Sequence, residues 1–282
     1  MSIPVASANG DGAGTFPYIV TAMAQHEASS SRAAQAPVAV RVSGLTKRYG
    51  AQRVLEAVDL EVAAGAAFGL LGLNGAGKTT LIKCLLDLCA HDGGGIALYG
   101  VPSEAPRARA RLVYLPERFA PPHYLSGREF LALMLGLAGK RYDAGRIEAR
   151  LAQLELEPSV LERRVRALSK GMTQKLGLAA VLLVERDLYL LDEPMSGLDP
   201  ATRIAVKSAL QALVAEGRTL FLTSHVLTDV EELCDSIAVL DRGAIRFRGA
   251  PRELCARYGE KSLERAFLRC IRHDGQPVAT VA

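Results

Sequence analysis

The chain has 282 residues, of which 49% are hydrophobic and 23% are charged, values that are typical of a folded globular protein and exclude a disordered or fibrous one. Its length is sufficient for one large α/β domain or two small ones. Lys and Arg total 34 against 30 Asp and Glu, without a dense basic block in the sequence, so nucleic acid is not predicted as a partner.

The five cysteines are scattered through the sequence, without a CxxC pair or a neighbouring His cluster. We interpret them as reduced thiols of a cytosolic protein. The longest apolar run, residues 130–139, is about half of the length needed to cross a bilayer, and the N-terminus lacks the basic start of a signal peptide. The sequence therefore predicts no membrane-spanning segment.

Residues 1–37 are rich in Ser, Ala and Gly and show no sustained period of 2 or 3.6 residues. They predict a disordered tail; the alternative, a targeting peptide, would be richer in Arg. Apolar residues then alternate over 38–42 and 54–62, which predicts two half-buried strands. A short apolar run at 66–71 and a helical pattern over 78–89 predict a strand, a tight loop and a helix.

Further strands separated by helical patterns are predicted at residues 95–99, 112–115, 188–191, 219–222 and 237–240. This alternation of strands and helices predicts a largely parallel sheet with helices on its faces.

The region between residues 117 and 168 lacks strand patterns and predicts two amphipathic helices, at 127–137 and 143–154. We interpret it as a helical subdomain inserted into the α/β region. After residue 249 the sequence predicts short helices, one of them with apolar residues at 263, 266 and 267.

The octapeptide GLNGAGKT at residues 72–79 matches the pattern GxxxxGK[ST] and lies between a predicted strand and a predicted helix. Glycines allow successive amides of such a loop to point at a polyphosphate, Lys78 reaches the β and γ phosphates, and the Thr79 hydroxyl binds Mg²⁺. A glycine-rich turn without a ligand is the alternative, and it leaves the flanking strand and helix unexplained. The predicted nucleotide-binding residues here are Gly72, Asn74, Gly75, Ala76, Gly77, Lys78, Thr79 and Thr80.

Two carboxylates, Asp192 and Glu193, follow the apolar strand predicted at 188–191. The C-terminal ends of parallel strands are where ligands gather in open α/β sheets. One carboxylate can hold the metal and the next can orient or deprotonate an attacking water. Asp192 as an ordinary helix cap is the alternative, which the phosphate loop makes the weaker interpretation.

The pentapeptide LSKGM at residues 168–172 precedes a long helical pattern, and Ser169 in its second position is a good N-cap. Together with the two preceding motifs it resembles the nucleotide-binding subunits of ATP-binding cassette (ABC) transporters, whose signature LSGGQ stands about 20 residues before the carboxylates. Lys170 and Met172 depart from that signature. The resemblance extends from about residue 38 to residue 270, with the motifs in the family's order.

This resemblance also implies roles for other segments of the chain. Tyr49 stands in the place of the aromatic residue that stacks on adenine, although a strand-edge tyrosine is its ordinary interpretation. The sequence SGLDP at 196–200 resembles the family's D-loop, which contacts the opposite subunit. His225 resembles the histidine that touches the γ-phosphate, and Ser169 and Gly171 of one subunit would face the phosphate loop of the other.

Glu117 departs from the family pattern, because a glutamine commonly stands after the strand predicted at 112–115. An ionised carboxylate can bind Mg²⁺ but cannot donate a hydrogen bond to a phosphate oxygen. The sequence YLPE at 114–117 resembles one subgroup of the family, in which the cassette is encoded apart from its permease and usually serves export.

The sequence thus predicts a P-loop NTPase core of α/β class with a mainly parallel sheet, an antiparallel β edge near residues 38–62 and an inserted helical subdomain. We expect a disordered tail at 1–37, an ABC ATPase domain at 38–248 with its helical subdomain at about 117–168, and a short extension at 249–282. Mg·ATP would be bound by the phosphate loop, Tyr49 and Asp192, with Glu117 as a further metal ligand. Glu193 would be the general base, and Lys78 and His225 would act on the phosphates.

The resemblance implies an ATPase subunit that powers transport, as a homodimer bound to a separate integral-membrane permease on the inner face of the cell membrane. A soluble ABC ATPase acting on ribosomes or DNA is the alternative; such relatives carry two cassettes or a long coiled coil, whereas this sequence has one phosphate loop and no heptad run. An ATP-binding regulatory module with degenerate chemistry is a third interpretation, against which the intact Lys78, Asp192 and Glu193 argue.

The segment FAPPHY at residues 119–124 combines apolar side chains with two prolines that restrict the loop. We interpret it as a surface of the helical subdomain that docks the membrane partner through Phe119 and Tyr124. A loop that covers the subdomain's own core is the alternative.

Overall fold

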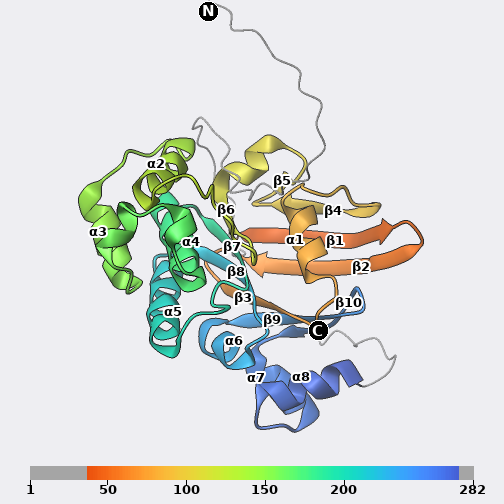
Figure 1. Cartoon of the computed structure of the whole chain (residues 1–282). Helices are drawn as coiled ribbons and strands as arrows, with labels where there is room; N and C mark the ends of the chain where they lie inside the picture. Colours follow the sequence, from red (N-terminus) through yellow and green to blue (C-terminus); the bar gives the residue numbers. More distant parts are fainter. Residues whose placement is uncertain (1–36, 273–282) are drawn as a thin grey trace, which may run out of the picture.

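The computed structural model describes residues 37–272, in which the strands form two sheets (Figure 1). A four-stranded antiparallel sheet has the order β2-β1-β4-β5, and a six-stranded sheet has the order β10-β9-β3-β8-β7-β6. The first sheet contains β1 (Val38–Tyr49), β2 (Gln52–Ala63), β4 (Gly93–Leu98) and β5 (Val101–Pro102). The second contains β3 (Ala67–Leu71), β6 (Leu112–Leu115), β7 (Leu188–Asp192), β8 (Thr219–Thr223), β9 (Ser236–Asp241) and β10 (Ala244–Gly249).

In the six-stranded sheet every neighbouring pair is parallel except β9 with β10, which is antiparallel. The predicted α/β class with a mainly parallel sheet and an antiparallel β edge is therefore confirmed. The predicted strands are all present, whereas β5 and β10 were not predicted. The short segment that forms β10 lies at the edge of its sheet, where it pairs only with β9.

Helices cover both faces of the six-stranded sheet. They are α1 (Lys78–Leu85), α2 (Gly127–Leu137), α3 (Ala144–Gln153), α4 (Lys170–Val184), α5 (Pro200–Ala215), α6 (Leu227–Leu233), α7 (Pro251–Tyr258) and α8 (Leu263–Arg272). Short 3-10 helices span Pro106–Arg111, Pro158–Leu161 and Val165–Ala167. The helix α1 is shorter than the predicted 78–89, because Asp87 adopts a left-handed backbone with φ of 56° just beyond its end.

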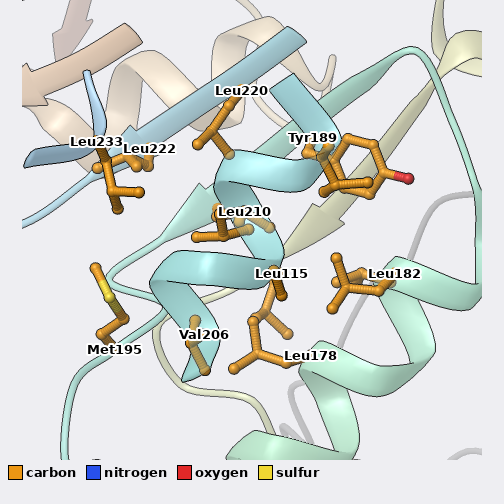
Figure 2. Close-up of a cluster of buried hydrophobic side chains, with 14 of the residues drawn as sticks. Leu115, Leu178, Leu182, Tyr189, Met195, Val206, Leu210, Leu220, Leu222 and Leu233 are labelled. Atoms are coloured by element: carbon orange, nitrogen blue, oxygen red, sulfur yellow. The ribbon is translucent and has the colours of Figure 1, made fainter. Parts of the chain in front are cut away.

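Alternate residues of β3 supply two separate cores. Ala67 and Leu71 belong to a cluster shared with α4, α5 and the helices that follow, whereas Phe68 and Leu70 belong to a cluster shared with α1 and the antiparallel sheet. This is the expected consequence of side chains alternating across a strand. Figure 2 shows the first core, in which Leu210 of α5 lies among side chains of the strands and of α4. The six-stranded sheet therefore lies between two packed cores.

The predicted helices between β6 and β7 are confirmed, as α2 and α3. Ser126 and Glu129 form a capping box at the start of α2, and Asp143 caps α3. Of the two aromatic residues expected to be exposed here, Phe119 was wrongly assigned. Its ring packs edge-on against Phe130 with centroids 5.7 Å apart and adjoins the subdomain's own core, as the alternative interpretation held. Tyr124 is 62% exposed.

The predicted tail at residues 1–37 lies almost entirely outside the described residues, as do residues 273–282. Among residues 37–272, no helix combines the length and apolar character that crossing a bilayer requires. The predicted helix carrying Leu263, Ala266 and Phe267 is confirmed as α8, and all three side chains are buried.

Candidate active site

The phosphate loop connects β3 to α1, as the sequence predicts. Gly75 and Gly77 have φ of 82° and 111°, a region that side chains other than glycine rarely adopt. Gly72 is required for another reason, since a Cβ there would lie 2.4 Å from the carbonyl oxygen of Leu240 at the end of β9. The loop therefore depends on glycine both for its own conformation and for its close approach to neighbouring backbone.

Lys78 begins α1 and folds back over the loop. Its Nζ donates hydrogen bonds to the carbonyl oxygens of Gly72, at 2.7 Å, and Leu73, at 3.2 Å, and the residue is 9% exposed. The charge of Lys78 thus lies inside the loop. Asn74, Gly75 and Thr79 are exposed, Thr80 is half-buried, and Ala76 and Gly77 are buried.

Asp192 ends β7, which lies between β8 and the edge strand β6. Its carboxylate accepts a hydrogen bond from the Thr223 hydroxyl at 2.6 Å, and the same hydroxyl oxygen accepts one from the Glu193 amide at 3.0 Å. Thr223 ends β8, which pairs with β7 through the register Asp192 with Thr223. One fully buried hydroxyl therefore holds the side chain of the first carboxylate and the backbone of the second.

The Asp192 environment suits a bound cation. Burial raises the pKa of Asp192, and the charges of Glu117 and Glu193 raise it further, while the hydrogen bond from Thr223 and the charge of Lys78 lower it. A divalent cation would offset the desolvation and the repulsion that raise this pKa. Carboxylate and hydroxyl oxygens, as supplied by Asp192 and Thr79, are the ligands that Mg²⁺ prefers, so these residues fit a magnesium ion.

Glu193 adopts a left-handed backbone with φ of 50°, a conformation that is uncommon for a residue with a side chain. It is 8% exposed, and its Oε2 accepts a hydrogen bond from the His225 amide at 3.3 Å. The same oxygen lies 2.7 Å from Nδ1 of the His225 ring. The structure therefore joins Glu193 and His225, two of the predicted catalytic residues, through one carboxylate oxygen.

Tyr49 lies at the end of β1, with 49% of its surface exposed. Its hydroxyl is 3.2 Å from Sγ of Cys89, and Nζ of Lys47 lies 4.9 Å from its ring centroid. The hydrogen bond with Cys89 and partial burial raise the pKa of Tyr49, so the ring stays neutral. An exposed neutral ring fixed at its hydroxyl end is suitable for stacking against a planar base.

The segment LSKGM leads into α4. Ser169 caps this helix, since its Oγ accepts a hydrogen bond from the Met172 amide at 3.2 Å. Further along α4, the buried Gln174 donates to the carbonyl oxygen of Pro194 at 3.2 Å. A Cβ on Gly171 would lie 4.0 Å from the carbonyl oxygen of Gly197. The segment LSKGM therefore adjoins the segment after the two carboxylates in the same chain.

Glu117 is exposed, and its charge contributes to raising the pKa of Asp192. Two contacts were not predicted: that of the Thr223 hydroxyl with Asp192 and that of the Gln174 amide with Pro194. Thr223 lies one residue beyond the strand predicted at 219–222, and no role was predicted for it. Its position at the end of β8, opposite Asp192, is the signal that would have identified it.

The chain is similar to known proteins over most of its length. A sequence model of the family "ABC transporter" matches residues 55–196. The daunorubicin resistance ATP-binding protein DrrA3 of Streptomyces coeruleorubidus is 38% identical over 251 residues, 88% of this chain and 78% of that protein. The Nod factor export ATP-binding protein I of Ralstonia nicotianae is 39% identical over 222 residues, 76% of this chain and 67% of that protein.

An uncharacterized ABC transporter ATP-binding protein of Synechocystis is 39% identical over 203 residues, which are 71% of this chain but only 57% of that protein. Among solved structures, an ATP-binding subunit of an ABC transporter aligns with a TM-score of 0.72 and 32% identity, covering 82% of this chain and 98% of that chain. A dimeric ATP-binding cassette bound to ADP and phosphate aligns with a TM-score of 0.68 and 20% identity, covering 75% and 98%, which concerns the fold alone.

These matches give no support to the alternative of a cassette that acts on ribosomes or DNA. The predicted resemblance and the P-loop NTPase fold are confirmed. Hydrogen bonds link Asp192 and Glu193 to Thr223, and Glu193 to His225. The chain belongs to the ABC transporter family, as one of its ATP-binding subunits.

Proposed function

We propose that this chain binds Mg·ATP and hydrolyses it, as one of two identical cassettes that power export through a separate integral-membrane permease. The observation that carries the proposal is the meeting of three motifs at one edge of the sheet. The phosphate loop follows β3, Asp192 ends β7 with Glu193 directly after it, and His225 follows β8. These strands are neighbours in the order β3-β8-β7. We assign the ATPase domain to residues 38–248, with the helical subdomain at about 117–168 and an extension at 249–282.

The phosphate loop would bind the triphosphate through its amides and Lys78, and Tyr49 would stack on the adenine ring. Mg²⁺ would be held by Thr79 and Asp192, with Glu117 as a further ligand. When bound, the ion supplies positive charge that neutralises the β and γ phosphates during transfer. Asp192 is oriented for this role by the hydrogen bond from Thr223.

Glu193 would take a proton from the attacking water. General bases of this kind act through a carboxylate held within hydrogen-bond reach of the water. The His225 amide and ring fix one oxygen of Glu193, which leaves the other oxygen for the water. His225, through the rest of its ring, would steady the γ-phosphate.

The test of this function is hydrolysis by the purified chain. We expect phosphate release from ATP that stops when EDTA removes magnesium and resumes when magnesium is restored in excess. A thermal shift on addition of ATP in EDTA would separate nucleotide binding from hydrolysis. Absence of both a shift and phosphate release would contradict the proposal.

A second copy of the chain would complete the site. In the proposed dimer, Ser169 and Gly171 of one subunit face the phosphate loop of the other. Ser169 is exposed, and its backbone begins α4, so its amide end is available to an anion. A solved cassette with this fold is itself a dimer, with ADP and phosphate bound.

Replacing Ser169 by Arg is expected to block ATP turnover and to leave ATP binding by the isolated monomer within about twofold, because the serine would serve the partner's site. The measurements are phosphate release and nucleotide titration below the dimerisation concentration. Ser159→Arg is a suitable control, since Ser159 is also exposed but lies in the 3-10 helix Pro158–Leu161. Equal loss of binding in the Ser169→Arg monomer would count against the shared site.

The proposal that this chain powers export is based on the names of its relatives. One is a drug resistance protein and another a Nod factor export protein, and both are ATP-binding proteins by name. We infer that this chain serves export of the same general kind, bound to a permease at the inner face of the cell membrane. The transported compound would be selected by the permease.

Replacing Tyr124 by Ala is expected to weaken association with membranes of the native organism about 30-fold, because a truncated aromatic anchor typically costs about 2 kcal/mol. Tyr124 is 62% exposed, next to His123, whose ring centroid lies 5.8 Å from its own. Ile204→Ala removes an equally exposed side chain, at 63%, from α5 and is the matched control. Membrane association that is unchanged by Tyr124→Ala would exclude docking at this loop.

A further inference from the structure

The turn between β9 and β10 connects the phosphate loop to β2 through a single residue, Gly243. Its amide donates a hydrogen bond to the carbonyl oxygen of Ala76 in the phosphate loop, at 3.0 Å. Its own carbonyl oxygen accepts one from the Glu56 amide of β2, at 2.8 Å. The two polar groups of one peptide residue therefore bind two different elements of the site.

An irregularity in the pairing of β2 with β1 makes this contact possible. In this pairing, Leu45 is opposite Val58 and Lys47 is opposite Leu55. Between these two pairs β2 advances by three residues while β1 advances by two. This is a β-bulge, which leaves one residue without its ladder partner. The bulge contains Glu56 and frees its amide from β1, and that amide turns to Gly243.

The backbones at this junction are too close for side chains. A Cβ on Gly243, which is buried and has φ of 82°, would lie 2.5 Å from the carbonyl oxygen of Val54. A Cβ on Gly77 of the phosphate loop would lie 3.0 Å from the same oxygen. Two glycines from separate elements thus approach one carbonyl group of β2, and the three elements are fixed against one another.

The same strand leads to the proposed adenine platform. Gln52, at the start of β2, pairs with Tyr49 at the end of β1. The junction at residues 54–56 is only a few residues away, about 13 Å along the strand at most. The hairpin that carries Tyr49 and the loop that would hold the phosphates are therefore linked through Gly243.

We propose that Gly243 is a positioning residue that sets the placement of the phosphate loop relative to Tyr49. The proposal rests on the proposed function, since it concerns how one ATP molecule is held at both ends. The affinity of a ligand that contacts both Tyr49 and the phosphate loop depends on the distance between them. A triphosphate without a base would contact only the phosphate loop. Small displacements of positioning groups have large effects on bound ligands.

The test compares two ligands, ATP and inorganic tripolyphosphate, by titration calorimetry with Gly243→Ala. We expect the Kd for ATP to rise about tenfold or more and the Kd for tripolyphosphate to change less than about threefold. Gly100→Ala is the matched control. Gly100 also has a positive φ, of 78°, but a Cβ there meets nothing within 4 Å. It carries the same backbone strain without the collision, and both Kd values should stay at the level of the unsubstituted chain.

If Gly243→Ala does not fold, the proposal can be tested with a second pair of variants, both at Glu56. Glu56→Pro removes the amide that donates to Gly243 and leaves the Gly243 to Ala76 hydrogen bond in place, and Glu56→Ala keeps that amide. We expect Glu56→Pro, but not Glu56→Ala, to weaken the binding of ATP more than the binding of tripolyphosphate.

The outcomes separate the two proposals. ATP affinity unchanged by Gly243→Ala or Glu56→Pro, or equal losses for ATP and tripolyphosphate, would overturn the role of Gly243 while the proposed function stands. An unsubstituted chain that binds tripolyphosphate but not ATP would overturn the proposed function, and the role of Gly243 with it.

Discussion

Replacing Glu193 by Gln is expected to lower the rate of ATP hydrolysis by about 10²- to 10⁴-fold, the usual contribution of a general base, while ATP binding stays within about twofold. The amide keeps the size and shape of the side chain and can still accept a hydrogen bond from His225. It cannot take a proton from water. The measurements are single-turnover hydrolysis and nucleotide titration with the same preparation.

The binding arm of this experiment is informative because Glu193 is nearly buried and its charge raises the pKa of Asp192. Removing that charge relieves repulsion, so ATP and Mg²⁺ binding should be kept or strengthened, and the dimer should persist in ATP. Glu148→Gln is the control, since Glu148 lies on the exposed face of α3. Hydrolysis near the unsubstituted rate in Glu193→Gln would show that another group activates the water.

Much of the fold could be predicted because its signals are local. The apolar run that became β3, the glycines after it and the helical spacing that became α1 all lie within residues 66–85. The same holds for Asp192 at the end of β7. Each of these signals depends on a few consecutive residues, whose periodicity and turn chemistry are readable without knowledge of the rest of the chain.

The contacts that the sequence could not predict join residues far apart in the chain. The hydroxyl of Thr223 reaches Asp192 across 31 positions, and the hydroxyl of Tyr49 reaches Cys89 across 40. Such contacts depend on which strands become neighbours, and the order of strands in a sheet cannot be predicted from the local periodicity of the sequence. Phe119 was wrongly assigned for the same reason, since Gly177 of α4 leaves the space into which its ring packs.

Replacing Lys78 by Ala is expected to weaken ATP binding about 10- to 150-fold, because hydrogen bonds that involve a charged group contribute about 1.5–3 kcal/mol. The ammonium group donates to the carbonyl oxygens of Gly72 and Leu73, so it also connects the start of the phosphate loop to Lys78 at the beginning of α1. Its loss would remove the proposed phosphate contact and also the hydrogen bonds that connect the two ends of the loop. Titration with ATP measures the sum of both effects, and urea unfolding without nucleotide measures the second alone.

Lys83→Ala is the matched control, since Lys83 has the same charge, lies on the same helix and is exposed in its last turn. Long-range attraction of the polyphosphate by the charge of the helix would be weakened similarly in both variants and would diminish in salt. A contact inside the loop would be lost only in Lys78→Ala. Equal losses in the two variants would therefore contradict the role of Lys78 inside the phosphate loop. A loss confined to Lys78→Ala that persists at high salt identifies the ammonium group within the loop as the source of the phosphate affinity.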